Sequence, residues 1–472
     1  MKKLNILISI LILSAVSCQK TVETNPNIIL IMTDDQGWGQ TGYYNHPVLK
    51  TPNLDAMAKN GIRFDRFYAA APVCSPTRAS VLTGRTNDRS GVPSHGYALR
   101  TQEKTIGKAL QKAGYATGHF GKWHLNGLRG PGVPIFKEDS HSPGNFGFDH
   151  WLTVTNFFDI NPLMSENGSF VDLKGDSSEI IVNKALAFIK EKSSQNVPFF
   201  TVIWDGSPHD PFVASEADRA NFKDLDEKSQ NHYGELVAFD RSLGVLRKTL
   251  RELGLEENTI LWFCSDNGGL RDIEPTTVGG LRGSKGAIWE GGLRVPSILE
   301  WPAMIEPKVT NYPASTMDIF PTIAELLDLP DSDLIQPIDG ISLKPIFSEN
   351  LKQRDTYIPF RFKDMGALIN NNYKLVATSI KENKFELYDL KDDPAESQDL
   401  TTEKPIVFEQ MKKAYLNLNA SIDSSVAGKD YPEGKVLKNP KSHFWMKDDR
   451  YEPFFEEWLE RPEYRKRILR GR

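Results

Sequence analysis

Short, continuous apolar runs recur along the first two thirds of this chain, with segments of helical pattern between them. The clearest runs are residues 28–32, 199–204 and 259–264, and residues 115–120 are a further, short strand candidate. Runs that are apolar at successive positions are typical of parallel strands covered on both faces. The expected helices begin near Thr51 and then span residues 105–113, 178–192 and about 232–253. The pattern predicts an α/β fold with a large, doubly wound, mostly parallel sheet and helices on both faces.

The predicted strands end in polar residues that can carry chemistry. In doubly wound sheets, the ligand crevice lies outside the carboxyl ends of the strands. We therefore expect four strand ends to bring one set of side chains to the same edge. The set comprises Asp34, Asp35, Lys122, His124, His209, Asp266 and Asn267.

Three carboxylates in this set, those of Asp34, Asp35 and Asp266, form an oxygen-rich cluster with the amide of Asn267 if the strand ends converge. Two carboxylates about 4 Å apart repel by roughly 4 kcal/mol at an effective dielectric near 20, so three require a cation or protonation. Oxygen ligands without histidine suit Ca²⁺ or Mg²⁺ better than Zn²⁺. The alternative is that Asp34 and Asp35 form a polar turn after a strand.

From about residue 355, the pattern changes to shorter strand-like pieces. These pieces are residues 357–362, 366–370, 374–378 and 385–390, and a helix is expected near 407–418. They predict a smaller C-terminal subdomain with a four-stranded antiparallel sheet and a helix. We divide the chain into a catalytic domain at 26–350 and a C-terminal subdomain and tail at 351–472. The basic end, Arg461 to Arg472, is expected to be a solvated terminal helix.

The first residues are typical of an export signal. Two lysines precede an apolar run from Leu4 to Val16, which is too short to be a good membrane span, and Cys18 follows a small residue. Residues 15–18 resemble a bacterial lipobox, which predicts a signal peptide at 1–18 and a lipid anchor on Cys18. We expect an exported bacterial protein of the periplasm, outer membrane or cell surface. A plain secretory signal and an internal cysteine of a cytoplasmic protein remain alternatives.

The formal net charge of −5 gives no reason to expect nucleic acid as a partner, which usually needs a basic face. Attraction of an anionic substrate must therefore be local. Cys74 stands just before Pro76, which can open a helix, and Arg78 follows one turn later. A side chain at this place is in the field of a helix N-terminus, which favours a bound anion. A buried cysteine at an ordinary loop–helix junction is the alternative.

Residues 74–85, Cys-x-Pro-x-Arg followed by Leu-Thr-Gly-Arg, resemble the signature of type I sulfatases of the alkaline phosphatase-like superfamily. In that family a maturation enzyme oxidises the cysteine to formylglycine. Residues 114–124 resemble the second family signature, although Phe120 stands where a smaller aliphatic residue is usual. Residues 208–212 and 283–286 resemble family loops that carry a histidine and a lysine, and residues 387–396 resemble the second subdomain.

The resemblance covers roughly residues 26–400 and implies a site. The implied catalytic residues are Cys74, Arg78, Lys122, His124, His209 and Lys285. The implied calcium ligands are Asp34, Asp35, Cys74, Asp266 and Asn267. In the mechanism expected from these groups, a hydrated aldehyde at residue 74 attacks sulfur with Asp266 as base, and His124 helps to release sulfate. His209, alone or jointly with Lys285, is expected to protonate the leaving oxygen. The family has one more contact from a polar side chain between the second signature and His209. Thr155, Asn156 and Asp159 are rival candidates for that residue.

An exported sulfatase is expected to act on a sulfated poly- or oligosaccharide. Cationic and aromatic residues near the motifs could pair with acidic groups or stack on sugars. The substrate-binding candidates are His95, Arg100, Arg271 and Arg282, and Trp38, His46 and Trp204 lie in similar loops. Two other functions stay open: a phosphonate or phosphate ester hydrolase of the same superfamily, and a non-catalytic, glycan-binding surface lipoprotein.

Overall fold

The computed structural model describes residues 25–471. The predicted signal peptide and Cys18 lie outside these residues. Within the described part of the chain, no helix has both the length and the apolar character needed to cross a membrane.

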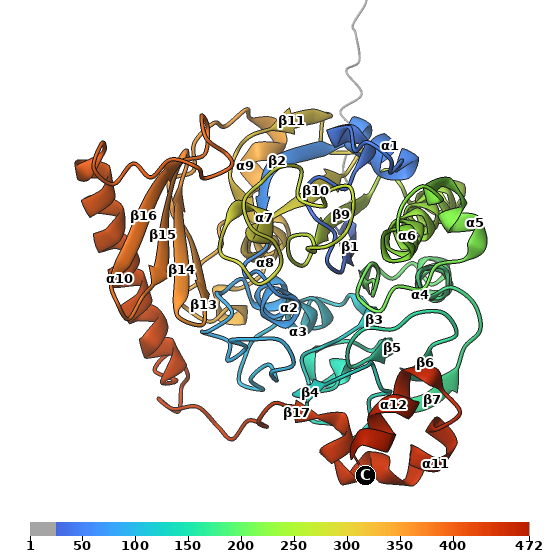
Figure 1. Ribbon diagram of the computed structural model, residues 1–472. Coiled ribbons are helices and arrows are strands. Elements are labelled where there is room, and N and C mark those ends of the chain that lie inside the picture. Colours follow the sequence, from blue (N-terminus) through green and yellow to red (C-terminus); the bar gives the residue numbers. More distant parts are fainter. Residues whose placement is uncertain (1–24, 472) are drawn as a thin grey trace, which may run out of the picture.

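The catalytic domain is built on one eleven-stranded sheet in the order β11-β2-β10-β9-β1-β8-β3-β5-β6-β7, with β12 paired to β2 (Figure 1). The strands β9, β1, β8, β3 and β5 are parallel to one another, whereas β10, β6 and β7 run antiparallel to their neighbours. The bounds are β1 (Asn27–Thr33), β2 (Ile62–Tyr68), β3 (Ala116–Lys122), β5 (His150–Val154), β6 (Leu163–Glu166), β7 (Ser169–Asp172), β8 (Phe199–Trp204), β9 (Thr259–Ser265), β10 (Arg294–Glu300), β11 (Lys308–Thr310) and β12 (Ala314–Ser315). The predicted mostly parallel sheet is confirmed.

Helices cover both faces of this sheet. Successive residues of β1 enter different cores: Ile28 and Leu30 pack on one face, and Ile29 packs on the other. This burial on both sides explains the continuous apolar run. One face is covered by α1 (Pro52–Asn60), α4 (Ser177–Ser194) and α6 (Glu227–Glu252), and the other by α2 (Cys74–Thr83), α3 (Ile106–Lys112), α8 (Ile319–Leu326) and α9 (Lys344–Ser348). Two short helices, α5 (Glu216–Arg219) and α7 (Glu290–Leu293), lie in loops.

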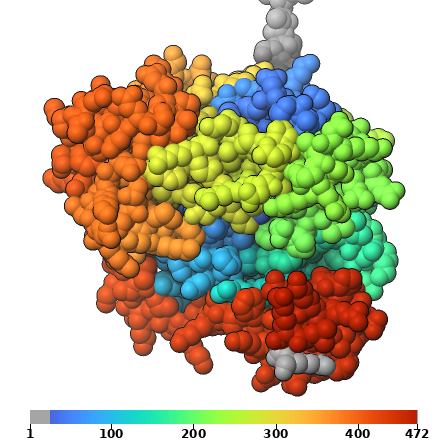
Figure 2. Space-filling model, viewed as in Figure 1, coloured from blue at the N-terminus to red at the C-terminus, as the bar shows by residue number. Residues whose placement is uncertain are grey.

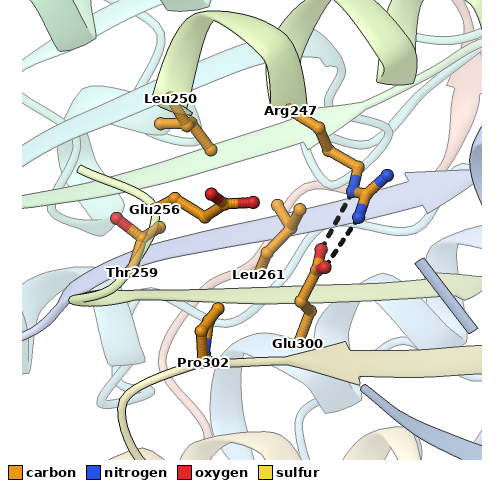
Figure 3. A pocket seen from close by; sticks show the side chains of 7 residues that line it. All are labelled: Arg247, Leu250, Glu256, Thr259, Leu261, Glu300 and Pro302. Atoms are coloured by element: carbon orange, nitrogen blue, oxygen red, sulfur yellow. Dashed lines mark hydrogen bonds and ion pairs between the residues drawn. The ribbon is translucent and has the colours of Figure 1, made fainter. Parts of the chain in front are cut away.

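A buried ion pair joins α6 to the sheet at the end opposite the expected site. Arg247 of α6 donates to both carboxylate oxygens of Glu300 at 2.9 and 2.7 Å (Figure 3). The small hollow beside the pair is also lined by Thr259, which begins β9. The hollow therefore lies at the amino end of the parallel strands and is separate from their carboxyl ends.

The C-terminal subdomain has the predicted antiparallel sheet in the order β13-β14-β15-β16. Its strands are β13 (Ile358–Phe362), β14 (Met365–Asn370), β15 (Tyr373–Ser379) and β16 (Lys384–Asp389). One face packs on α10 (Pro405–Val426) through residues that include Leu375 and Met411. The other face packs on the catalytic domain, where Phe360 shares a core with Tyr68 and Val73.

The last segment of the chain returns to the catalytic domain, where β17 (His443–Phe444) pairs with β4 (Leu128–Arg129). The helices α11 (Phe455–Trp458) and α12 (Pro462–Gly471) follow. Figure 2 shows this segment in red, against the cyan part of the catalytic domain. The expectation of a solvated terminal helix is wrong for one face of α12, because Tyr464 and Ile468 are buried in an aromatic cluster with Trp445 and Trp458.

Candidate active site

The carboxyl ends of neighbouring strands bring the predicted acidic residues together. Asp34 follows β1 and Asp266 follows β9, and these strands are parallel, with Thr33 opposite Ser265. Asp35 has a positive φ of 67° and donates its backbone N–H to Asp266 Oδ1 at 3.2 Å. Asn267 Nδ2 donates to Asp35 Oδ1 at 2.8 Å. These side chains are almost fully buried, so their charges interact through the interior of the protein.

Each of the three carboxylates is paired with a different cation. Arg78 in α2 and Lys122 at the end of β3 are fully buried, and Lys285 comes from the loop before α7. The pairs are Lys122 with Asp34, Arg78 with Asp266 at 2.7 Å, and Lys285 with Asp35 at 2.7 Å.

Burial and neighbouring charges shift the pKa values of Asp34 and Asp266 in opposite directions. Burial alone would raise the pKa of Asp34, but Lys122 and the other nearby cations lower it well below its usual range. Burial and the Asp34 carboxylate raise the pKa of Asp266 to about 7, although Arg78 opposes this change. The crowded carboxylates therefore disfavour full ionisation of the cluster unless a further cation joins it.

The donor atoms fit a hard metal ion. Asp34 Oδ1 and Asn267 Oδ1 are buried without a hydrogen-bond partner. Ligand atoms of Asp34, Cys74 and Asp266 lie within 4.8 Å of one another, as do those of Asp34, Asp35 and His209. A set dominated by oxygen suits calcium or magnesium. The structure thus brings together all five residues expected to hold calcium, and it adds one histidine beside them.

Cys74 is the first residue of α2 and lies in the wall of a cavity of about 320 Å³. Its Sγ is 3.2 Å from His124 Nδ1. Burial raises the pKa of the Cys74 thiol, so an unmodified cysteine would stay protonated and be a poor nucleophile. Burial also lowers the pKa of His124 well below its usual value, so its imidazole is neutral at neutral pH.

His209 and Lys285 line the same cavity. The imidazole of His209 stacks on Phe157 with ring centroids 4.8 Å apart, and Nδ1 lies 2.6 Å from the Asp210 carbonyl oxygen. Burial and Lys285 lower the pKa of His209 to about 4. The ring is therefore neutral at neutral pH, and a bound anion beside it would favour its protonated form.

Among the rival polar residues after β5, Asn156 lines the cavity. Its Nδ2 donates to the Gly130 carbonyl at 2.7 Å, and its Oδ1 is buried without a partner. Thr155 Oγ1 instead accepts the backbone N–H of Val133, and Asp159 is not part of the cavity wall. The geometry favours Asn156 as the residue that faces a ligand.

The expected substrate-binding residues separate into two groups. His95 lines the cavity, whereas Arg100, Arg271 and Arg282 do not. Arg100 is 8% exposed and donates to the Ser425 and Val426 carbonyls, so it fastens the end of α10 to the catalytic domain.

Arg282 serves a similar structural purpose. It donates to the Tyr388 hydroxyl and the Glu396 carbonyl, and its guanidinium is 3.5 Å from the centre of the Trp289 ring. Arg271 is exposed and donates to Ser284 Oγ at 2.8 Å. The placement of Arg100 and Arg282 corrects our expectation for both residues.

The aromatic candidates and His46 also have structural partners. Trp38 stacks on Tyr44, His46 accepts the Leu49 backbone N–H, and the Trp204 ring lies under Arg78 at 5.1 Å. Six further residues, which no sequence motif indicated as site residues, also line the cavity: Val73, Arg129, Gly130, Phe157, Phe444 and Arg467. Phe444 and Arg467 belong to the returning C-terminal segment, and no local motif marks them.

Comparisons with known proteins agree with this geometry. A sulfatase family model matches residues 26–329, and a model described as N-sulphoglucosamine sulphohydrolase, C-terminal, matches residues 284–421. The chain is 34% identical over 385 residues to N-acetylgalactosamine-6-sulfatase of Sus scrofa, covering 74% of this chain and 71% of the relative. It is 30% identical over 369 residues to an ulvan-active sulfatase of Formosa agariphila, covering 71% and 69%.

Solved structures share the fold. The crystal structure of Ps i-CgsB in complex with k-i-k-neocarrahexaose matches with a TM-score of 0.75 and 24% identity, covering 94% of this chain and 99% of the other. A phosphonate monoester hydrolase of Agrobacterium radiobacter matches with a TM-score of 0.60 and 19% identity, covering 88% and 100%.

Proposed function

Because this chain belongs to the sulfatase family and is a sulfuric ester hydrolase, we propose that it removes sulfate from a sulfated oligo- or polysaccharide by using formylglycine made from Cys74 and a calcium ion. The observation that carries the proposal is the position of Cys74. It lies at the start of α2, in a cavity, next to a neutral histidine and a cluster of three cations and three carboxylates. The relatives named for acetylgalactosamine sulfate and ulvan support a carbohydrate substrate.

The proposed metal ligands are Asp34, Asp35, Asp266, Asn267 and residue 74. A calcium ion held there would act as a Lewis acid that polarises oxygen atoms at the reacting group. The hydrated aldehyde at residue 74 would supply an oxygen nucleophile and a second hydroxyl whose deprotonation releases sulfate.

The side chains around residue 74 have separate proposed roles in proton transfer and charge stabilisation. Asp266 is the proposed base for the attacking hydroxyl, because its carboxylate lies beside residue 74: ligand atoms of Asp34, Cys74 and Asp266 are within 4.8 Å of one another. His124 takes the proton of the second hydroxyl, because its Nδ1 is in reach of the residue 74 side chain. Arg78, Lys122 and Lys285 offset the negative charge of the transferring group.

We place the leaving group of the substrate next to His209, and Lys285 lies beside this histidine. Both side chains line the cavity, and both also lie beside Asp35, whose carboxylate is 2.7 Å from Lys285 Nζ and 4.0 Å from His209 Nε2. A negatively charged sulfate ester next to His209 would raise the pKa of this imidazole, and the protonated ring could then give a proton to the sugar oxygen.

The decisive experiment examines the peptide that contains residue 74. We expect protein produced with a maturation enzyme to have an aldehyde there, by mass spectrometry, and to release sulfate. The Cys74→Ala variant should fold equally well, with an unchanged melting temperature, and show no turnover. A residue 74 that keeps its sulfur in fully active protein would refute the proposal.

The substrates of this experiment also separate the sulfatase from a phosphonate or phosphate ester hydrolase. Matched sulfate and phosphonate monoesters of one alcohol should be compared by kcat/KM. We expect the sulfate ester to react faster. A reversed preference would identify the enzyme as a phosphonate ester hydrolase with the same fold.

A further inference from the structure

The cavity that contains Cys74 also has two arginines on its wall, Arg129 and Arg467. Arg129 ends β4, and Arg467 comes from α12 near the end of the chain. In the described residues, neither guanidinium has an ion pair or a hydrogen bond. Arg129 is held only over the Phe444 ring, at 4.9 Å from its centre. Both side chains are partly exposed and can reach a ligand.

These arginines differ from the cations at the reaction centre. Lys122, Arg78 and Lys285 each contact a carboxylate, whereas no acidic residue lines the cavity. No carboxylate in the cavity wall therefore neutralises the positive charges of Arg129 and Arg467. His95 is affected by this field, because burial, followed by the charges of Arg129 and Lys285, lowers its pKa.

The C-terminal segment fixes the position of Arg467. The Tyr464 hydroxyl, one turn earlier in α12, donates to the Gly132 carbonyl at 2.6 Å, and the Tyr451 hydroxyl donates to the Pro134 carbonyl at 2.8 Å. Both carbonyls belong to the loop after β4, which carries Arg129. Parallel pairing of β4 with β17 aligns Arg129 with Phe444. The two arginines are thus presented by elements that are packed on each other.

Resting on the proposed sulfatase function, we propose that Arg129 and Arg467 bind a second anionic group of the same saccharide, either a carboxylate or another sulfate. Guanidinium groups match both anions, because their N–H donors form paired hydrogen bonds with two oxygens. The C-terminal segment then selects multiply charged saccharides over those that carry one sulfate.

The test measures binding without turnover. Full-length Cys74→Ala protein is titrated by calorimetry with three disaccharides: one with a single sulfate, one with the same sulfate and a carboxylate, and one with two sulfates. Loss of a hydrogen bond to a charged group typically changes affinity by about 10- to 100-fold. We expect the doubly charged ligands to bind at least 10-fold more tightly, and we expect Arg129→Gln or Arg467→Gln to remove most of that preference. The two doubly charged ligands show which anion the arginines prefer.

Arg465→Gln is the matched control, because Arg465 is an exposed arginine of α12 that does not line the cavity. The Arg465→Gln variant should show the same preference for doubly charged ligands as the parent. Arg467→Lys should keep part of the preference. Equal affinity of the parent for all three ligands, or an unchanged preference in both glutamine variants, would overturn the proposal. The proposed function fails by a different result, which is the absence of sulfate release by matured protein with intact Cys74.

Discussion

A buried glutamate at the interface of the two domains should make the stability of the protein depend on pH. Glu396 has no exposed surface, and its carboxylate is 2.8 Å from Lys374 Nζ. The same lysine contacts Glu290 at 3.0 Å, and the Glu290 backbone N–H donates to Glu396 Oε2 at 2.7 Å. Burial and the Glu290 carboxylate raise the pKa of Glu396 from 4.5 to about 7, although Lys374 opposes this change.

The direction of the effect follows from proton binding. Between pH 4.5 and 7 the folded protein keeps the proton of Glu396, whereas the unfolded chain has lost it. The free energy of unfolding therefore falls as the pH rises through this window. A pKa change of this size corresponds to about 3 kcal/mol. For a chain of 472 residues, that free energy is equivalent to about 3 °C in melting temperature.

The assay compares thermal unfolding of the parent and Glu396→Gln at pH 5 and at pH 8. Glutamine keeps an acceptor for the Glu290 N–H but cannot ionise. We expect the melting temperature of the variant, relative to the parent, to be about 3 °C higher at pH 8 than at pH 5. Glu409→Gln, at an exposed glutamate of α10, should show no such difference. A relative melting temperature that is the same at both pH values would refute the reasoning.

Three further predictions concern the metal, the leaving group and the amino terminus. Asp266→Ala should lower the calcium content measured by elemental analysis, and normal calcium would contradict the ligand assignment. His209→Ala should slow hydrolysis of a carbohydrate sulfate by about 10²- to 10⁴-fold but slow hydrolysis of an activated aryl sulfate much less. The control, Arg78→Ala, should slow both reactions. Equal losses on both substrates in the His209 variant would show that His209 is not the general acid. Cys18→Ala should release the protein from membranes in a sedimentation assay, and unchanged sedimentation would rule out the lipid anchor.

The strand ends could be predicted because parallel topology is a strong constraint. Once β1 and β9 are assigned as continuous apolar strands, Asp34 and Asp266 must lie at the same edge of the sheet. The contact between Cys74 and His124 was implied instead by the resemblance to the family signatures. The convergence of the strand ends needed only local patterns and one rule of topology.

Contacts between distant segments could not be predicted in this way. We expected Arg100 to bind a substrate, but its guanidinium donates to the carbonyl of Ser425, 325 residues away in the sequence. Phe444 and Arg467 line the cavity only because a two-residue strand pairs with β4 and an aromatic cluster anchors α12. Neither feature has a periodic pattern long enough to be recognised in the sequence.

The balance of charge at the reaction centre leads to a last prediction, on metal removal. The three carboxylates are already matched by three cations, so the cluster has little net charge to attract sulfate by itself. A divalent cation would leave an excess of positive charge beside residue 74. One additional unlike pair about 4 Å apart contributes roughly 4 kcal/mol at an effective dielectric near 20, before the cost of desolvation.

We therefore expect inorganic sulfate to bind the calcium-loaded protein at least tenfold more tightly than the chelated protein. A tenfold difference in affinity requires only part of the interaction energy of that unlike pair. Calorimetric titration of sulfate before chelation, after chelation and after return of calcium measures the difference. Chloride at the same ionic strength is the control for screening. Equal affinity in all three states would mean that Arg78, Lys122 and Lys285 attract sulfate without help, although each is engaged by a carboxylate, and the charge argument would be wrong.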